Sequence, residues 1–106
     1  MAVRRFMMNG VELIAQERKR QIEAEGWTKE HDDTHEFGEL AIAGACYALT
    51  GYTLTDLMGS PIDVDGFIND LWPWDDEWYK PKDRLRNLVR AGALIAAEID
   101  RIQNRG

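Results

Sequence analysis

The chain has little of what marks secreted, membrane-spanning or nucleic-acid-binding proteins. Among its 106 residues there is one cysteine, Cys46, so a disulfide within the chain and a cysteine-rich zinc site are both excluded. A single cysteine favours a reducing, cytoplasmic setting. The longest apolar run, Leu40 to Leu49, has ten residues, and a bilayer requires about 20, so we expect no membrane association. No N-terminal segment has the apolar length of a signal peptide.

Positive charge is also scarce. The chain has 13 Lys and Arg residues against 19 Asp and Glu residues, and its net charge is −6. A broad nucleic-acid-binding surface is therefore not expected. This balance fits a soluble protein, a cation-binding site or a surface that mimics a polyanion.

Length and pattern predict one small helical domain over residues 1–106. An apolar content of 44% argues against disorder, and no segment has the alternation of a strand. We predict an all-α fold, a small helical bundle of three main helices with a long, Trp-rich ordered loop before the last helix. The loop, residues 52–79, is expected to be irregular, with helical turns near 53–58 and 65–71.

The first two predicted helices have clear start signals. Asn9, with Glu12 three residues later, predicts a helix over 10–25 that ends at Gly26. Asp33 or Thr34 is the predicted N-cap of a second helix, which runs to about residue 49. Their predicted apolar faces are Val11, Ile14, Ala15, Arg18 and Ile22 on the first, and Phe37, Leu40, Ala41, Gly44, Ala45 and Ala48 on the second.

The last helix has the strongest pattern. Pro81 suits its first turn, and the helix could reach about residue 104. Its main stripe has helical spacing throughout, and Ala91 and Leu94 lie beyond it. A monomer would then leave apolar surface exposed, so we expect a homo-oligomer. The stripe consists of Leu85, Leu88, Val89, Gly92, Ile95, Ala96, Ile99 and Ile102.

Residues 30–39 concentrate carboxylates and both histidines. Glu36 and Glu39 are three residues apart, so on one helix they would share a face, and with Asp33 they would offer the oxygen ligands that Mg²⁺ or Mn²⁺ prefers. The alternative is a capping box followed by a solvated acidic face, because acidic residues favour the first turn of a helix.

His31 and His35 are the candidate catalytic residues. A neighbouring carboxylate raises the pKa of a histidine toward neutral pH, which suits proton transfer. The two could instead ligate a metal, since they are four residues apart. A third interpretation is that they are hydrogen-bonded surface groups.

Two resemblances add to this interpretation. His35-Glu36-Phe37-Gly38-Glu39-Leu40-Ala41 resembles the E-x-x-E-L helix of the all-α MazG-like nucleoside triphosphate pyrophosphohydrolases. The resemblance implies that Glu36 and Glu39 bind magnesium, which activates water and holds the phosphates. The second acidic pair of that family, E-x-x-D, has no counterpart, because the last helix has Glu98-Ile99-Asp100 instead.

The whole chain also resembles a group of small uncharacterised phage and prophage proteins. This resemblance implies a setting and no chemistry. The segments that carry it are Gly26-Trp27, His31-Asp32-Asp33, Gly38-Glu39-Leu40, Trp72-Pro73-Trp74, Lys80-Pro81 and residues 88–95.

The segment 72–81 is rich in tryptophan and is followed by cations. Aromatic faces stack nucleobases, and Lys80, Lys82 and Arg84 near the start of a helix could meet phosphates, so Trp78 and these cations are candidate substrate-binding residues. The alternative is that the large aromatic side chains hold the loop against the helices. We expect this segment and residues 26–40 to meet in one site.

Three functions fit these features. The first is a divalent-metal-dependent nucleotide pyrophosphohydrolase that cleaves between the α- and β-phosphates. The second is a non-catalytic nucleotide-binding protein, or sponge. The third is an acidic inhibitor or interaction protein in which the runs 30–39 and 63–77 occupy a basic groove on a host protein.

Overall fold

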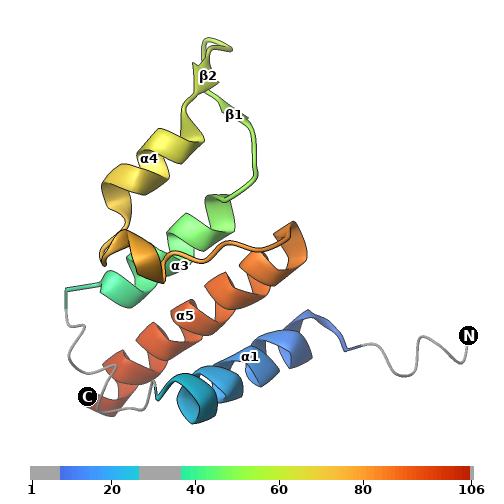
Figure 1. Cartoon of the computed structure of the whole chain (residues 1–106), viewed down its shortest axis with the longest axis vertical. Helices are drawn as coiled ribbons and strands as arrows, with labels where there is room; N and C mark the ends of the chain where they lie inside the picture. The colour runs from blue at the N-terminus through green and yellow to red at the C-terminus, as the bar shows by residue number, and fades with distance from the viewer. Residues whose placement is uncertain (1–7, 27–36, 106) are drawn as a thin grey trace, which may run out of the picture.

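The computed structural model describes residues 8–26 and 37–105 (Figure 1). This part of the chain is mostly helical, which confirms the predicted helical character. Its elements are α1 (Gly10–Glu25), α3 (Glu39–Leu49), β1 (Leu54–Thr55), β2 (Pro61–Ile62), α4 (Val64–Leu71), the 3₁₀ helix η2 (Asp76–Trp78) and α5 (Arg84–Arg105).

Helix α1 begins and ends as predicted. The side chain of Asn9 accepts a hydrogen bond from the backbone N–H of Glu12 at 2.9 Å, and the Glu12 carboxylate accepts one from the N–H of Asn9 at 3.0 Å. Gly26 ends the helix in the left-handed region, with φ of 72°. A capping box and a left-handed glycine are local signals, which is why the sequence alone located both ends.

Helix α3 begins later than predicted. Its first residue is Glu39, and its N-cap is Gly38 with φ of +84°. A left-handed residue interrupts a helix, so the prediction of one continuous helix from Asp33 or Thr34 was wrong. Glu36 lies outside the described residues.

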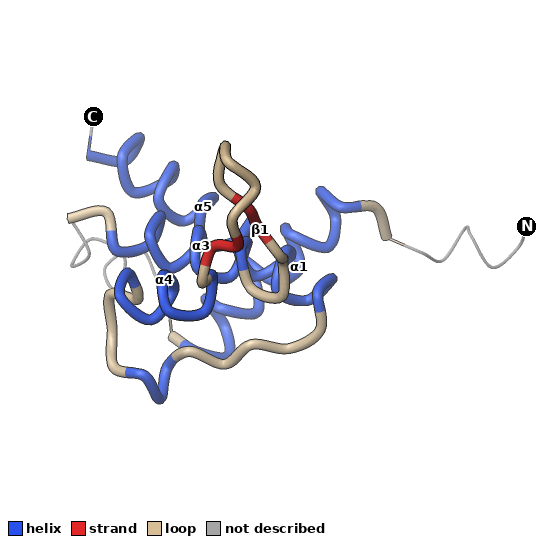
Figure 2. Tube along the Cα trace, turned by 90° about the horizontal axis from the view of Figure 1, so that it is seen from above, coloured by secondary structure: helices blue, strands red, loops and turns tan. Residues whose placement is uncertain are grey.

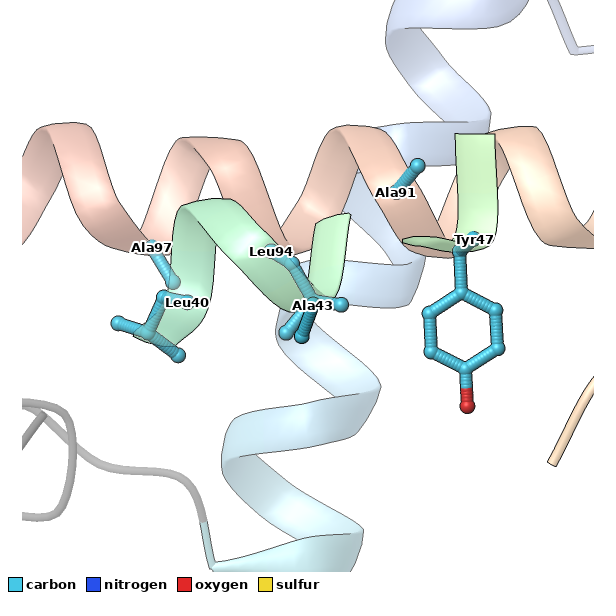
Figure 3. Close-up of a cluster of buried hydrophobic side chains, with 6 residues drawn as sticks. All are labelled: Leu40, Ala43, Tyr47, Ala91, Leu94 and Ala97. Carbon is cyan, nitrogen blue, oxygen red and sulfur yellow. The ribbon is translucent and has the colours of Figure 1, made fainter. Parts of the chain in front are cut away.

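The centre of the fold is the packing of α3 on α5. Leu40, Ala43 and Tyr47 of α3 lie against Ala91, Leu94 and Ala97 of α5, and all six are buried (Figure 3). Small residues let the two helices approach closely. A Cβ atom at Gly44 would lie 3.2 Å from the backbone oxygen of Ala91.

The predicted buried face of α3 was partly wrong. Phe37 is 84% exposed, and Ala41 and Ala45 are exposed, whereas Ala43 and Cys46 are fully buried. The predicted face was rotated from the real one because the helix contains many small apolar residues, which give no clear contrast between its sides.

Helix α1 packs against α5 on the side away from α3 (Figure 3), and part of this contact is polar. Glu17 is 9% exposed, and its carboxylate accepts hydrogen bonds from the Nε and Nη2 atoms of Arg20, both at 2.8 Å, with the Nε of Arg90 at 3.8 Å. Burial alone would raise the pKa of Glu17, but the hydrogen bonds and charges of the two arginines outweigh it and lower that pKa. Gln21, fully buried, donates to the same carboxylate.

Helix α5 begins at Arg84 rather than near Pro81. The Asp83 carboxylate accepts from the backbone N–H of Arg86 at 2.9 Å and so caps the helix. The large residues of the predicted stripe are exposed, its residues Val89, Gly92 and Ala96 are partly buried, and the residues beyond it, Ala91 and Leu94, form part of the core. The structure is therefore consistent with the expectation that one copy leaves apolar surface exposed.

The segment between α3 and α5 contains more regular secondary structure than predicted. Residues 53–58, expected to form a helical turn, instead contribute to a β-hairpin in which Leu54 pairs with Ile62 and Thr55 with Pro61. The turn expected near 65–71 is α4. Figure 1 shows the hairpin at the end of the molecule farthest from α1, and Figure 2, seen from that end, shows it in front of the helices.

Candidate functional site

The predicted catalytic and metal-binding residues are mostly outside the described part of the chain. His31, Asp33, His35 and Glu36 all fall within residues 27–36, so their predicted roles stay predictions. Within residues 8–26 and 37–105, no three Asp, Glu, His or Cys side chains lie close enough together to hold a metal ion. A site for Mg²⁺ or Mn²⁺ would thus depend on residues 27–36.

Glu39 is the one predicted metal ligand that the structure describes. It is half-buried as the first residue of α3, and its Oε1 atom accepts a hydrogen bond from the backbone N–H of Phe37 at 2.7 Å. This bond stabilises the bend at Gly38. An acidic residue here also complements the positive end of the helix dipole.

Two of the predicted substrate-binding residues lie together. Trp78, at the end of η2, is 53% exposed, and the Nζ atom of Lys80 lies 5.6 Å from the centre of its ring. An exposed indole beside an ammonium group can stack a nucleobase or another flat ring. Among the four predicted substrate-binding residues, all within the described part of the chain, Trp78 and Lys80 are the two that lie together.

The other two predicted cations lie elsewhere. Arg84 stacks its guanidinium 4.8 Å from the ring centre of Tyr52 and donates to the backbone oxygen of Gly51 at 3.4 Å, just beyond the last turn of α3. Glu39 is at the first turn of that helix, which spans about 16 Å at 1.5 Å per residue. A metal on Glu39 and a phosphate on Arg84 would therefore be far apart. Lys82 is exposed, with its backbone N–H donated to the Asn87 side chain at 2.7 Å.

Tyr47 fixes the position of the Trp78–Lys80 segment. Its hydroxyl accepts a hydrogen bond from the backbone N–H of Lys80 at 2.9 Å and donates to the backbone oxygen of Trp78 at 3.4 Å. Arg90 of α5 contributes from the other side, donating to the Lys80 oxygen at 2.8 Å. One buried phenol thus ties α3 to a segment more than thirty residues further along the chain.

Trp72, Trp74 and Tyr79 hold the loop against the core, as the structural alternative for the tryptophans expected. The ring centres of Trp72 and Tyr79 are 5.0 Å apart, and those of Trp72 and Trp74 are 5.5 Å apart at 89°. Tyr79 also shares a hydrogen bond of 2.5 Å with the Thr50 hydroxyl. Burial raises the pKa of Tyr79, so this hydroxyl stays protonated at neutral pH.

A strong charge asymmetry marks residues 51–79, here called the acidic lobe. This stretch has seven carboxylates and no Lys or Arg. All seven are exposed, and none forms an ion pair within the described part of the chain. The lobe itself therefore contributes only negative charge, and the cations that lie against it are Lys80, beside Trp78, and Arg84, beside Tyr52. Its carboxylates are Asp56, Asp63, Asp65, Asp70, Asp75, Asp76 and Glu77.

The hairpin tip adds exposed apolar side chains to this lobe. Leu57 is fully exposed and Met58 is 90% exposed. The turn that carries them is well defined, because the Asp56 carboxylate accepts from the N–H groups of Met58 and Ser60, both at 2.9 Å, and Gly59 has φ of 84°. These two large apolar side chains have no role in the packing of residues 8–26 and 37–105.

A pocket of about 330 Å³ lies in the same lobe, between α4 and η2. Its aromatic walls are Trp72 and Tyr79, and its carboxylates are Asp65 and Asp76, with Ile68 and Asn69 completing it. Aromatic faces and carboxylates together favour an organic cation, such as the end of a lysine or arginine side chain. No motif in the sequence predicted this pocket. The signal that could have indicated it is the absence of Lys and Arg over residues 30–79.

Comparison of the chain with known protein families, with curated proteins and with solved structures gave no match. None of the helices in residues 8–26 and 37–105 is both long and apolar enough to cross a membrane. Function must therefore be argued from the surface of the described part.

Proposed function

We propose that this protein is an interaction protein whose acidic lobe binds a basic surface on a protein partner. The observation that carries the proposal is the combination, on one lobe, of seven unpaired carboxylates with two exposed apolar side chains at the hairpin tip. Protein interfaces commonly combine a few apolar anchors with a polar rim.

The apolar part of this surface extends beyond the tip. Phe67 and Leu71 are four residues apart on α4, and both are partly exposed, at 52% and 39%. They share one flank of that helix, while Val64 and Ile68 of the same helix are buried against α3. The lobe thus has apolar side chains at its tip and on its side, with carboxylates around them.

The expected partner has an apolar pocket bordered by Lys and Arg. Leu57 would enter that pocket, and the carboxylates would pair with the surrounding cations. Charge of one sign over a whole lobe accelerates encounter with the opposite charge, and the effect weakens as salt is added. The pocket between α4 and η2 would receive one basic side chain of the partner.

The test is affinity capture from lysate of the source cells with four forms of the protein. Wild type should retain a partner at low salt and release it at high salt. Leu57→Glu and the double variant Asp65→Lys/Asp76→Lys should lose it. Glu23→Lys, a charge reversal at an exposed carboxylate of α1 that pairs with Lys19, should keep it. A partner that all four forms retain equally would contradict the proposal.

Nucleotide binding is a second candidate, supported by the exposed Trp78 ring beside Lys80. Whether such binding includes metal-dependent hydrolysis at Glu36, Glu39 and Asp33 stays a prediction, as does the phage or prophage setting. Thermal unfolding against a panel of nucleotides, with and without Mg²⁺ or Mn²⁺, tests it. A ligand at 100 times its dissociation constant adds about 2.7 kcal/mol of stability. Stabilisation that disappears in Trp78→Ala would favour this candidate, and product analysis would then separate a hydrolase from a binding protein.

A further inference from the structure

A second pocket, of about 380 Å³, lies between α1 and the first half of α5, two helices that pack side by side (Figure 1). Its volume is in the range of small-molecule sites. Three arginines and one carboxylate supply its charges: Arg20, Arg86, Arg90 and Glu17. The whole chain has a net charge of −6, whereas positive groups outnumber negative ones three to one in this lining. The pocket therefore favours an anion.

Glu17 is the buried member of this set, and it takes up the charge of one arginine. Its carboxylate accepts hydrogen bonds from the Nε and Nη2 atoms of Arg20, both at 2.8 Å. The remaining Nη1 atom of Arg20 donates to Glu25 at 3.2 Å. All three nitrogens of this guanidinium thus have acceptors within the chain. A ligand would consequently be bound by the two arginines of α5.

Arg86 and Arg90 offer donors that the chain itself does not use. They are four residues apart, so they share one face of α5. Arg90 is held in place, because its Nη1 atom donates to the Lys80 oxygen at 2.8 Å and its Nε atom lies 3.8 Å from the Glu17 carboxylate. In the described part of the chain, its Nη2 atom has no acceptor, and the exposed guanidinium of Arg86 has neither an ion pair nor a hydrogen bond. One held and one unpaired guanidinium therefore line the same pocket.

Apolar side chains form much of the remaining wall. Leu13 and Val89 are half-buried, and Leu85 is 61% exposed. An anionic group at the arginines would thus have its organic body against an apolar surface. Guanidinium groups bind carboxylates in bidentate geometry. The nearby Glu17 carboxylate repels each further negative charge, which favours a singly charged carboxylate over a doubly charged phosphate.

We propose that the pocket between α1 and α5 binds an organic acid, a single carboxylate attached to an apolar body about the size of an aromatic ring. The carboxylate pairs with Arg86 and with the Nη2 atom of Arg90. The apolar body lies against Leu13, Leu85 and Val89. None of these residues belongs to the acidic lobe, so binding here is independent of the proposed partner surface.

Nuclear magnetic resonance titration of the full chain with phenylacetate, phenylacetamide and inorganic phosphate tests the proposal. Phenylacetate should shift the backbone amide signal of Val89 and the side-chain Nε–H signal of Arg90, with a dissociation constant on the order of 1 mM or below. Phenylacetamide has the same ring without the charge, and phosphate has charge without the ring, so both should bind at least roughly tenfold more weakly. Wild-type pocket signals that phenylacetate does not move, or that phosphate moves at the same concentration, would overturn the proposal.

Three variants locate the site. Arg86→Gln removes the unpaired guanidinium from an exposed position and should weaken phenylacetate binding roughly threefold or more. Gln16→Glu, at an exposed residue that lines the pocket, adds a like charge and should weaken it too. Lys19→Gln removes an exposed cation of α1 outside the pocket and should bind like wild type. Equal affinity in Arg86→Gln and wild type would overturn the proposal. An equal loss in Arg86→Gln and Lys19→Gln would do the same, because it would indicate attraction by overall charge alone.

An apolar carboxylate comes either from a free acid or from the C-terminus of a polypeptide. An acetylated tripeptide that ends in phenylalanine has the same ring and carboxylate as phenylacetate, with peptide groups added. In the same titration, tighter binding of phenylacetate would support a free acid as the ligand. Tighter binding of the tripeptide would assign the pocket to a polypeptide C-terminus instead.

Discussion

Replacing Tyr47 with phenylalanine removes one hydroxyl and keeps the ring that packs between α3, α5 and the tryptophan segment. The lost group accepts from the backbone N–H of Lys80 at 2.9 Å and donates to the Trp78 oxygen at 3.4 Å. The Tyr47 side chain is 3% exposed, and both hydrogen bonds are partly buried, so water only partly replaces the lost hydroxyl. A buried donor without a partner costs about 1–3 kcal/mol.

We therefore expect Tyr47→Phe to lower the free energy of unfolding by about 1–3 kcal/mol. For a chain of this size, urea lowers that free energy by about 1–3 kcal/mol per molar, so the unfolding midpoint should fall by on the order of 1 M. Circular dichroism of the helices reports the transition. Hydrogen exchange at the Lys80 amide should accelerate, because the hydroxyl is its acceptor.

Tyr52→Phe is the matched control. Tyr52 is 36% exposed, and its ring would stay beneath Arg84 after the change, so its effect should be within about 0.5 kcal/mol. If the two variants unfold at the same urea concentration, the bond to Lys80 does not hold the segment, and the position of Trp78 must have another cause.

Two further predictions concern the helices. Ala43→Leu adds volume at a fully buried site between α3 and α5 and should lower the free energy of unfolding by about 1–3 kcal/mol. Ala45→Leu, on the exposed side of the same helix, should change it by no more than about 0.5 kcal/mol. Equal urea midpoints for the two variants would mean that the packed face of α3 is assigned wrongly. The pKa of Glu17 is lowered on folding, so its contribution to stability is complete above its ordinary value of about 4.5 and is lost as the pH falls through the folded pKa. Glu17→Gln should lower stability at neutral pH and weaken its decline in acid, and Glu23→Gln on the exposed side of α1 should do neither. A Glu17→Gln protein with an unchanged pH profile of unfolding would show that the contacts to Arg20 and Arg90 do not stabilise the fold.

How much of the fold could be predicted depended on whether the signal was local. The ends of α1 follow from Asn9, Glu12 and Gly26, which act on their immediate neighbours, and α4 was expected from residues 65–71. The start of α3 was predicted wrongly because several capping residues precede it, and only the left-handed conformation of Gly38 distinguishes the real start. The hairpin was missed because its strands have two residues each, too few for any alternation.

The candidate site likewise has features that local sequence indicated and features that depend on tertiary contacts. Sequence alone indicated that Trp72 and Trp74 could hold a loop and that Trp78 could meet a ligand, since all are large aromatic residues in an irregular segment. Their different exposure depends on tertiary contacts. Trp72 packs on Tyr47 and Tyr79, and Tyr47 lies more than twenty residues before Trp72 in the chain, so no short-range pattern indicates the contact.

Composition and short-range pattern by themselves determined that this is a helical chain with a single cysteine, a net negative charge and a long apolar pattern on its last helix. Tertiary structure decided which side of that helix is buried. Ala91, Leu94 and Ala97 face α3, and Gly44 of α3 lets the two helices approach closely there. Leu85, Leu88, Ile99 and Ile102 remain exposed on α5. Helical periodicity shows that an apolar face exists. Which of two such faces enters the core depends on the shape of the helix that packs against it.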